Sequence, residues 1–121
     1  MLRRLGIAAI CATIAGCTFN DPTESTFSAG FRNDLGYAVK LGMCSSYTCQ
    51  GKLYYTDYVK RGATIHENIS SDGVVQPFRI ESTPRDQVVG CLQVYAKRYV
   101  PHLVIALSRL TRCPGRKIRV A

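Results

Sequence analysis

Short segments in which hydrophobic and polar residues alternate run through most of the chain. In residues 37–43, Val39, Leu41 and Met43 fall on one face and Lys40 on the other, which is the two-residue period of a half-buried strand. Turn residues such as Gly, Pro, Asn and Asp separate the segments of this kind: 26–32, 37–43, 52–59, 63–69, 74–81, 87–96 and 116–121. The pattern predicts an all-β fold, a small antiparallel β-sandwich or barrel of about seven or eight strands.

Three features indicate how individual strands are placed. Glu67 interrupts the apolar face of 63–69, which favours a position at a sheet edge. Pro77 has no backbone N–H to donate, so it favours an edge strand or a bulge. The dipeptide Asp72-Gly73 lies between two apolar segments and predicts a hairpin that joins 63–69 to the next strand.

The segment 102–110 fits two structures. Leu103 and Leu107 lie at helical spacing, as do further apolar residues of the segment. The segment is short, however, and Val104 and Ile105 are β-branched, so we favour a buried strand over a helix.

The first seventeen residues have the organisation of an export signal. Arg3 and Arg4 precede an uncharged run from Leu5 to Ala15, whereas a membrane-spanning helix needs about 20 apolar residues. The run ends in Ile14-Ala15-Gly16-Cys17, which resembles the lipobox of bacterial lipoproteins, whose cysteine receives diacylglycerol and acyl chains such as palmitate. The sequence therefore predicts a signal-peptide helix and lipidation of Cys17.

This signal would divide the chain into a removed signal peptide (1–16), a lipidated polar tether (17–25) and one domain (26–121). Two alternatives remain open at this stage. An ordinary secretory signal cut after Ala15 would give a secreted protein without lipid. A helix buried in the fold would give no export at all.

The six cysteines fit this division, because Cys11 would leave with the signal peptide and Cys17 would carry the lipid. Four cysteines remain in the predicted domain, an even number that suits disulfides in an oxidising compartment: Cys44, Cys49, Cys91 and Cys113. They allow three pairings. We favour a bond between Cys44 and Cys49, which closes a small turn. The second bond would then join Cys91 to Cys113 and tie a strand to the C-terminal segment.

Zinc binding by these cysteines is the alternative to disulfides. Zinc sites usually have CxxC-type spacings or clustered histidines, and the sequence has neither. We therefore expect no metal site.

Positive charge is concentrated in the last part of the chain. Residues 17–86 carry seven basic and eight acidic side chains, whereas 87–121 carry seven basic side chains and no acidic one. In an exported chain this favours contact with an anionic component of the envelope rather than with nucleic acid, although a solvated face without a partner would give the same pattern. The residues expected at such a contact are Arg109, Arg112, Arg116, Lys117 and Arg119.

Few residues are arranged for catalysis. His66 and Glu67 are neighbours on a predicted strand and point to opposite faces, and the other histidine, His102, is distant in sequence. Phosphate-binding loops and the HExxH and G-x-S-x-G motifs are missing. We therefore expect no catalytic residue, no cofactor and no enzyme activity.

Tyrosines are concentrated around the first two cysteines: Tyr47, Tyr54, Tyr55 and Tyr58. Tyrosine offers a large contact area and a hydroxyl at low entropy cost, so the cluster suits a recognition surface. Ordinary packing within the strands is the alternative explanation.

The order of features in NDLGYAVKLGMC…C…RG…VGCL…LSRLTRCP resembles a group of small secreted or lipid-anchored bacterial proteins known from actinobacteria. The matching residues lie within 31–114: Asn33, Cys44, Cys49, Gly90-Cys91-Leu92, Ser108-Arg109 and Cys113. The resemblance implies a small all-β domain and brings no particular activity with it.

Together these features predict a lipid-anchored binding module on the outer side of a bacterial membrane, without catalysis. Its partners would be the membrane, through the lipid, and an anionic envelope component or a protein. The first alternative is a small exported inhibitor of a hydrolase that uses the loop 45–58. An enzyme is the second, and it would need a cleft that holds His66 or His102 beside a carboxylate.

Overall fold

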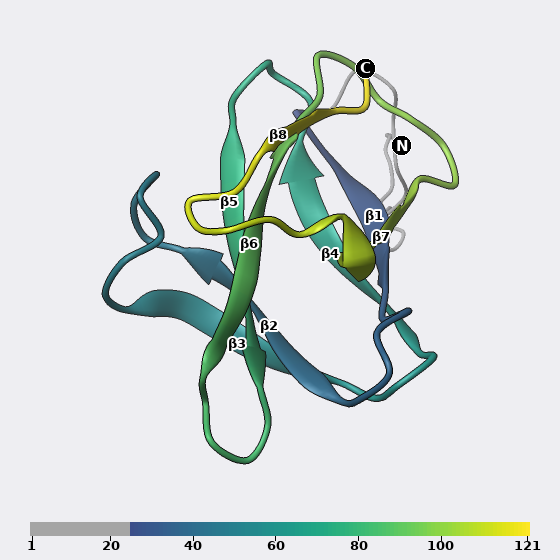
Figure 1. Ribbon diagram of the computed structural model, residues 1–121. Coiled ribbons are helices and arrows are strands. Elements are labelled where there is room, and N and C mark those ends of the chain that lie inside the picture. The colour runs from purple at the N-terminus through teal and green to yellow at the C-terminus, as the bar shows by residue number, and fades with distance from the viewer. Residues whose placement is uncertain (1–24) are drawn as a thin grey trace, which may run out of the picture.

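The computed structural model describes residues 25–121. The predicted signal peptide, the lipidation at Cys17 and most of the predicted tether lie outside the described residues. Within 25–121 the chain forms eight strands and one short 3₁₀ helix (Figure 1). These are β1 (Thr26–Arg32), β2 (Val39–Cys44), β3 (Leu53–Val59), β4 (Thr64–Ser70), β5 (Gln76–Ser82), β6 (Val88–Tyr95), β7 (Val104–Ala106), the 3₁₀ helix η1 (Leu107–Arg109) and β8 (Lys117–Arg119).

The strands build a small sheet in the order β4-β1-β7 and a large sheet in the order β3-β2-β5-β6-β8. The predicted all-β fold and its number of strands are confirmed. Most pairs are antiparallel, but β1 pairs with β7 and β6 pairs with β8 in parallel, which the pattern did not predict. Both parallel partners come from the last part of the chain, so the C-terminal segment completes one edge of each sheet (Figure 1).

One hydrophobic core lies between the two sheets. Every second residue of β1 points into it, so that Phe27, Ala29 and Phe31 are fully buried. The ring of Phe31 packs on that of Phe78 from β5, with 4.9 Å between the ring centroids. An aromatic pair of this kind stabilises the contact beyond the area that it buries, and here it joins the two sheets.

Asn33 closes one end of this core. Its side chain is fully buried, and its Nδ2 donates to the carbonyl oxygens of Tyr37 at 2.9 Å and Val59 at 3.0 Å. Its Oδ1 accepts from the backbone N–H of Leu35 at 3.0 Å. Asn33, which carries part of the family resemblance, therefore has a structural role that joins the end of β1 to the ends of β2 and β3.

The structure confirms the predicted edge position of the Glu67 strand, because β4 is the first strand of the small sheet. The predicted hairpin at Asp72-Gly73 is wrong. Strand β4 pairs with β1, whereas β5 pairs with β2 and β6, so the turn carries the chain from one sheet to the other. Gly73 has a φ of 76°, which suits a tight turn whether or not the two flanking strands pair with each other. The turn residues alone therefore do not determine the pairing.

The predicted edge or bulge at Pro77 is also wrong. Strand β5 lies in the middle of the large sheet, between β2 and β6, and its register shift falls between Ile80 and Glu81. Pro77 is tolerated there because it lies just outside the pairing with β2, which begins at Phe78, opposite Met43. Beyond that pair, β2 needs no N–H from β5.

Both structures considered for 102–110 are present in part. Residues Val104–Ala106 form the favoured strand, and Leu107–Arg109 form a single helical turn. Asp34 stabilises this turn, since its carboxylate accepts from the backbone N–H of Ser108 at 2.8 Å and from the Ser108 hydroxyl. The hydrogen bonds from Ser108 lower the pKa of the Asp34 carboxyl, and they outweigh the opposing effect of burial.

Candidate functional site

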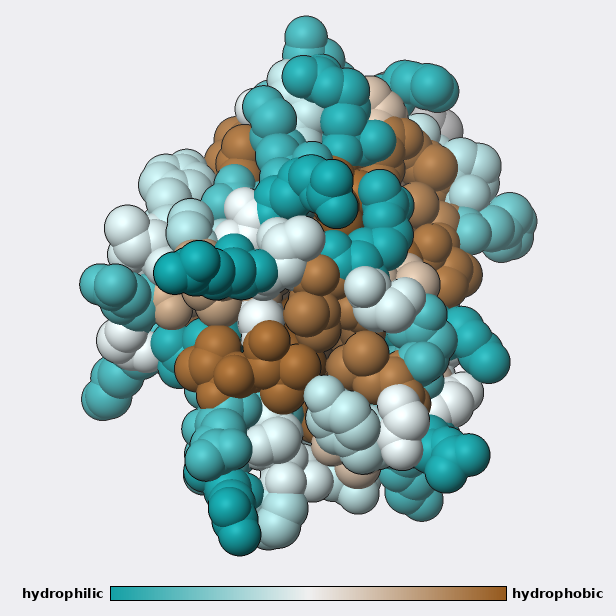
Figure 2. Space-filling view, in the orientation of Figure 1, coloured by the Kyte–Doolittle hydropathy of each residue, from teal (hydrophilic) through white to brown (hydrophobic). Residues whose placement is uncertain are grey.

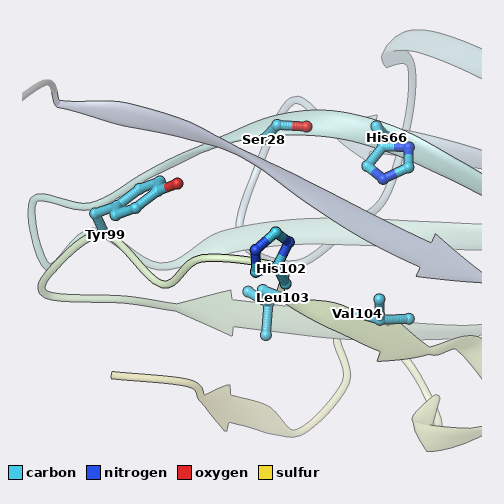
Figure 3. A pocket seen from close by; sticks show the side chains of 6 residues that line it. All are labelled: Ser28, His66, Tyr99, His102, Leu103 and Val104. Atoms are coloured by element: carbon cyan, nitrogen blue, oxygen red, sulfur yellow. The ribbon is translucent and has the colours of Figure 1, made fainter. Parts of the chain in front are cut away.

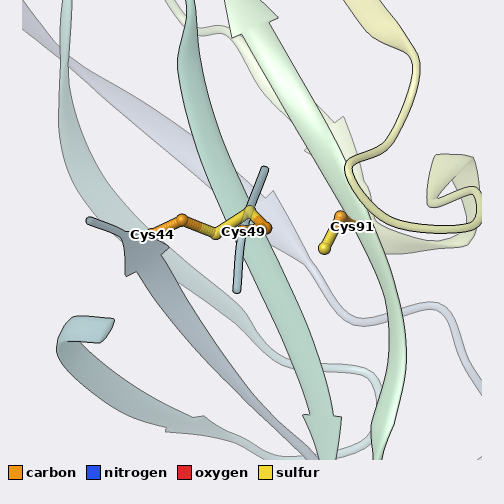
Figure 4. Close-up of side chains that lie close together, drawn as sticks. All are labelled: Cys44, Cys49 and Cys91. Carbon is orange, nitrogen blue, oxygen red and sulfur yellow. A yellow bond between two sulfur atoms is a disulfide. The ribbon is translucent and has the colours of Figure 1, made fainter. Parts of the chain in front are cut away.

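The predicted disulfides are confirmed, with Cys44 bonded to Cys49 and Cys91 bonded to Cys113. The sulfurs of Cys44, Cys49 and Cys91 lie within 4.8 Å of one another (Figure 4). The two disulfides are therefore neighbours on the outer face of the large sheet. With Leu53 they form a second, smaller hydrophobic cluster, and hydrophobic residues gather in the middle of this face, surrounded by polar ones (Figure 2).

Arg79 on β5 fixes the loop that the first disulfide closes. Its Nη1 donates to the carbonyl oxygens of Cys49 at 2.9 Å and Gly51 at 3.0 Å. Its Nε and Nη2 each lie 2.9 Å from Oε2 of Glu81, and the two side chains are only 13% and 11% exposed. The loop is thus held by a covalent bond and by a buried guanidinium, which sequence reasoning missed. The sequence offered one signal for this ion pair, because Arg79 and Glu81 lie two residues apart and therefore on the same face of a predicted strand.

A groove with a volume of about 250 Å³ lies beside this loop, and we call it the tyrosine groove. It is lined by Met43, Cys44, Ser45, Ser46, Tyr47, Tyr54, Val75, Gln76 and Pro77. Tyr47 and Tyr54 are 62% and 70% exposed, so their rings project from the surface. The predicted tyrosine cluster therefore divides, because Tyr58 is exposed outside the groove and Tyr55 is half-buried.

A second pocket, of about 340 Å³, lies on the small sheet and contains both histidines of the chain (Figure 3). Its lining consists of Ser28, His66, Tyr99, His102, Leu103 and Val104. The fold brings the histidines together from β4 and from the turn before β7, which their distance in sequence did not indicate. No carboxylate lies among these lining residues.

Two acidic residues meet where the edge strands β3 and β4 adjoin. Burial raises the pKa of Glu67 to about 7, and the hydrogen bond with Asp57 and the negative charge of Asp57 add to this. The hydroxyl of Tyr55 donates to Glu67 and acts in the opposite direction. The pKa of Tyr55 itself is raised, first by burial and then by the charge of Glu67. Glu67 therefore shares its surroundings with Asp57 and Tyr55, and not with His66.

The structure brings together only two of the basic residues that we expect at an anionic contact. The Nζ of Lys117 and the guanidinium of Arg119 lie 4.9 and 4.6 Å from the ring centroid of Tyr95. Both cations come from β8 and flank a single ring on β6. Arg109, Arg112 and Arg116 are exposed in η1 and in the loop between η1 and β8. Contact of these residues with an anionic surface stays a prediction.

Comparisons with protein-family models, with curated proteins and with solved structures give no match for this chain. Within residues 25–121, no helix has the length and hydrophobicity that are needed to cross a membrane.

Proposed function

We propose that this chain is a binding module of the bacterial cell envelope, anchored by lipid at Cys17 and without catalytic activity, whose tyrosine groove recognises a protein partner. The observation that carries this proposal is the preformed state of the groove. A loop that is closed by a disulfide and held by Arg79 has little conformational freedom left to lose on binding.

The side chains of the groove suit a protein partner. Tyr47 and Tyr54 are more than half exposed and stand beside Met43, Val75 and Pro77, which gives an apolar surface with hydroxyl groups at its border. Rigid aromatic side chains of this kind are enriched where proteins contact one another.

Three features support the placement in the envelope. The domain contains two disulfides, which persist in oxidising compartments. The first seventeen residues have the organisation of a lipoprotein signal. The diacylglycerol and acyl chains at Cys17 would anchor the chain, and the exposed cations Lys117 and Arg119 would add attraction toward anionic headgroups.

Capture of a partner from envelope extracts tests the groove. We expect the immobilised mature chain to retain one protein in stoichiometric amount, and a variant with both Tyr47→Ser and Tyr54→Ser to lose it. Tyr58→Ser is the matched control, because Tyr58 is 58% exposed but lies outside the groove. Retention of the partner by the double variant, or no captured protein at all, contradicts the proposal. A captured hydrolase whose activity falls on binding would establish the inhibitor alternative.

Replacement of the lipidated cysteine tests the anchor. We expect Cys17→Ser to move the chain from the membrane fraction to the soluble fraction, and globomycin, which blocks lipoprotein signal peptidase, to cause the precursor to accumulate in the wild type. Cell fractionation with immunoblotting and mass spectrometry of the mature N-terminus measure both effects. If the variant stays membrane-bound and the precursor is still processed, the lipid anchor is wrong; a wild-type chain without lipid in the medium would establish the secreted alternative.

A further inference from the structure

The pocket on the small sheet is built so that its two histidines face a common space. His66 of β4 lies opposite Gly30 of β1, and Gly30 lies opposite Val104 of β7. Ser28, two residues before Gly30, is on the same face of the sheet, and His102 precedes β7 (Figure 3). The two imidazoles therefore stand on either side of β1, which is the central strand of this sheet.

His102 has a left-handed backbone conformation, which costs a residue with a Cβ more than it costs glycine. It follows Pro101 in a turn and has a φ of 56°, the left-handed region that glycine adopts without steric cost. For a residue with a Cβ this conformation is unfavourable, and such residues are concentrated at sites with a function. Glycine would adopt this conformation at lower steric cost, so the backbone at this position does not require an imidazole.

Both imidazoles are available as ligands. Among residues 25–121, the imidazole of neither His66 nor His102 has a hydrogen bond or an ion pair. The other lining residues bring two hydroxyl groups, from Ser28 and Tyr99, and no charged group. The lining therefore holds no lysine or arginine that would repel a cation.

We propose that His66 and His102 bind a divalent transition-metal ion of the zinc type. Neutral imidazole nitrogen is a preferred ligand of Zn²⁺, Ni²⁺ and Cu²⁺, whereas Mg²⁺ and Ca²⁺ require oxygen ligands that this pocket supplies poorly. Two protein ligands leave further coordination positions to water, and Ser28 and Tyr99 add hydroxyl groups to the lining of the same pocket. This site is on the small sheet, whereas the tyrosine groove borders the large sheet, so the inference is independent of the proposed function.

Titration with Zn²⁺ tests the site, with the mature chain carrying Cys17→Ser so that no free thiol competes. We expect saturable binding of one ion per chain in isothermal titration calorimetry, with shifts of the imidazole signals of both histidines in NMR spectra. His66→Gln is expected to weaken binding about tenfold or more. Mg²⁺ at the same concentrations serves as the cation control, and no saturable heat is expected from it.

His102→Gly separates binding from folding. Glycine adopts the same φ without strain, so this variant is expected to keep or raise the melting temperature while it loses Zn²⁺ binding about tenfold or more. His102→Asn, which also tolerates a positive φ, is expected to behave in the same way. Absence of saturable Zn²⁺ binding by the parent chain overturns the proposal. Equal binding by the parent, His66→Gln and His102→Gly also overturns it, because the ion would then bind elsewhere.

Discussion

Replacing Arg79 with methionine is expected to lower the free energy of unfolding by about 3–5 kcal/mol. Methionine fills a similar volume but leaves the carboxylate of Glu81, which is largely buried, without its cation. It also removes the donor to the carbonyl oxygens of Cys49 and Gly51, so that the stapled loop loses its attachment to β5. Urea denaturation at pH 7, monitored by tyrosine fluorescence, measures the loss.

Two further variants identify the cause. The double variant Arg79→Met with Glu81→Gln is expected to recover much of the lost stability, because no unpaired charge then remains buried. Arg79→Lys keeps the charge but lacks the planar fork that reaches Glu81 and the loop at once, so an intermediate stability is expected. An Arg79→Met variant that unfolds at the same urea concentration as the wild type would show that the ion pair contributes nothing. Because the loop borders the tyrosine groove, weaker capture of the partner should accompany the loss of stability.

Replacing Glu67 with glutamine is expected to remove a large part of the pH dependence of stability. The pKa of Glu67 is about 7 in the folded chain and near its ordinary value of 4.5 when unfolded, because burial disfavours the charged form. The folded state therefore holds the proton more tightly, and its stabilisation is complete below pH 4.5 and is lost as the pH rises through 7. Because solvent screens this partly exposed carboxyl, we expect the wild type to lose about 1–2 kcal/mol from this group between pH 5 and pH 8.

Urea denaturation at pH 5, 6, 7 and 8 compares the two chains. At pH 8 the glutamine variant should be the more stable one, and at pH 5 the two should differ little, since Glu67 is then mostly protonated. Asp72→Asn removes an exposed acid from a turn and serves as the control that should leave the pH dependence in place. Parallel losses of stability in the wild type and the glutamine variant would refute the role assigned to Glu67.

Local signals predicted much of the fold. The alternation in residues 37–43 and 26–32 reflects one buried and one exposed face, and this preference holds wherever the strand is placed in a sheet. The pairing of Cys44 with Cys49 could be favoured because a short loop brings its ends together at little entropic cost. Pairing between distant segments had no such signal, which is why the turn at Asp72-Gly73 suggested a hairpin where the chain changes sheets.

The candidate site was predictable only in part. The tyrosines around the first disulfide were visible in the sequence, but which of them lines a groove depends on the register of β3. The meeting of His66 and His102 depends on the parallel pairing of β1 with β7, and no local pattern encodes it. Glu67 was recognised as exceptional on its strand, while its neighbours Asp57 and Tyr55 could be known only from the packing of one sheet edge against the other.

The parallel pairing of β1 with β7 also sets the order in which the fold can form. The first strand of the domain remains without one of its two neighbours until the segment around Val104 is available, close to the C-terminal end. Contacts between such distant segments form slowly, because a long loop must close before they contribute any stability. In an exported chain, as proposed above, β1 would therefore gain this neighbour only after the segment of β7 has crossed the membrane.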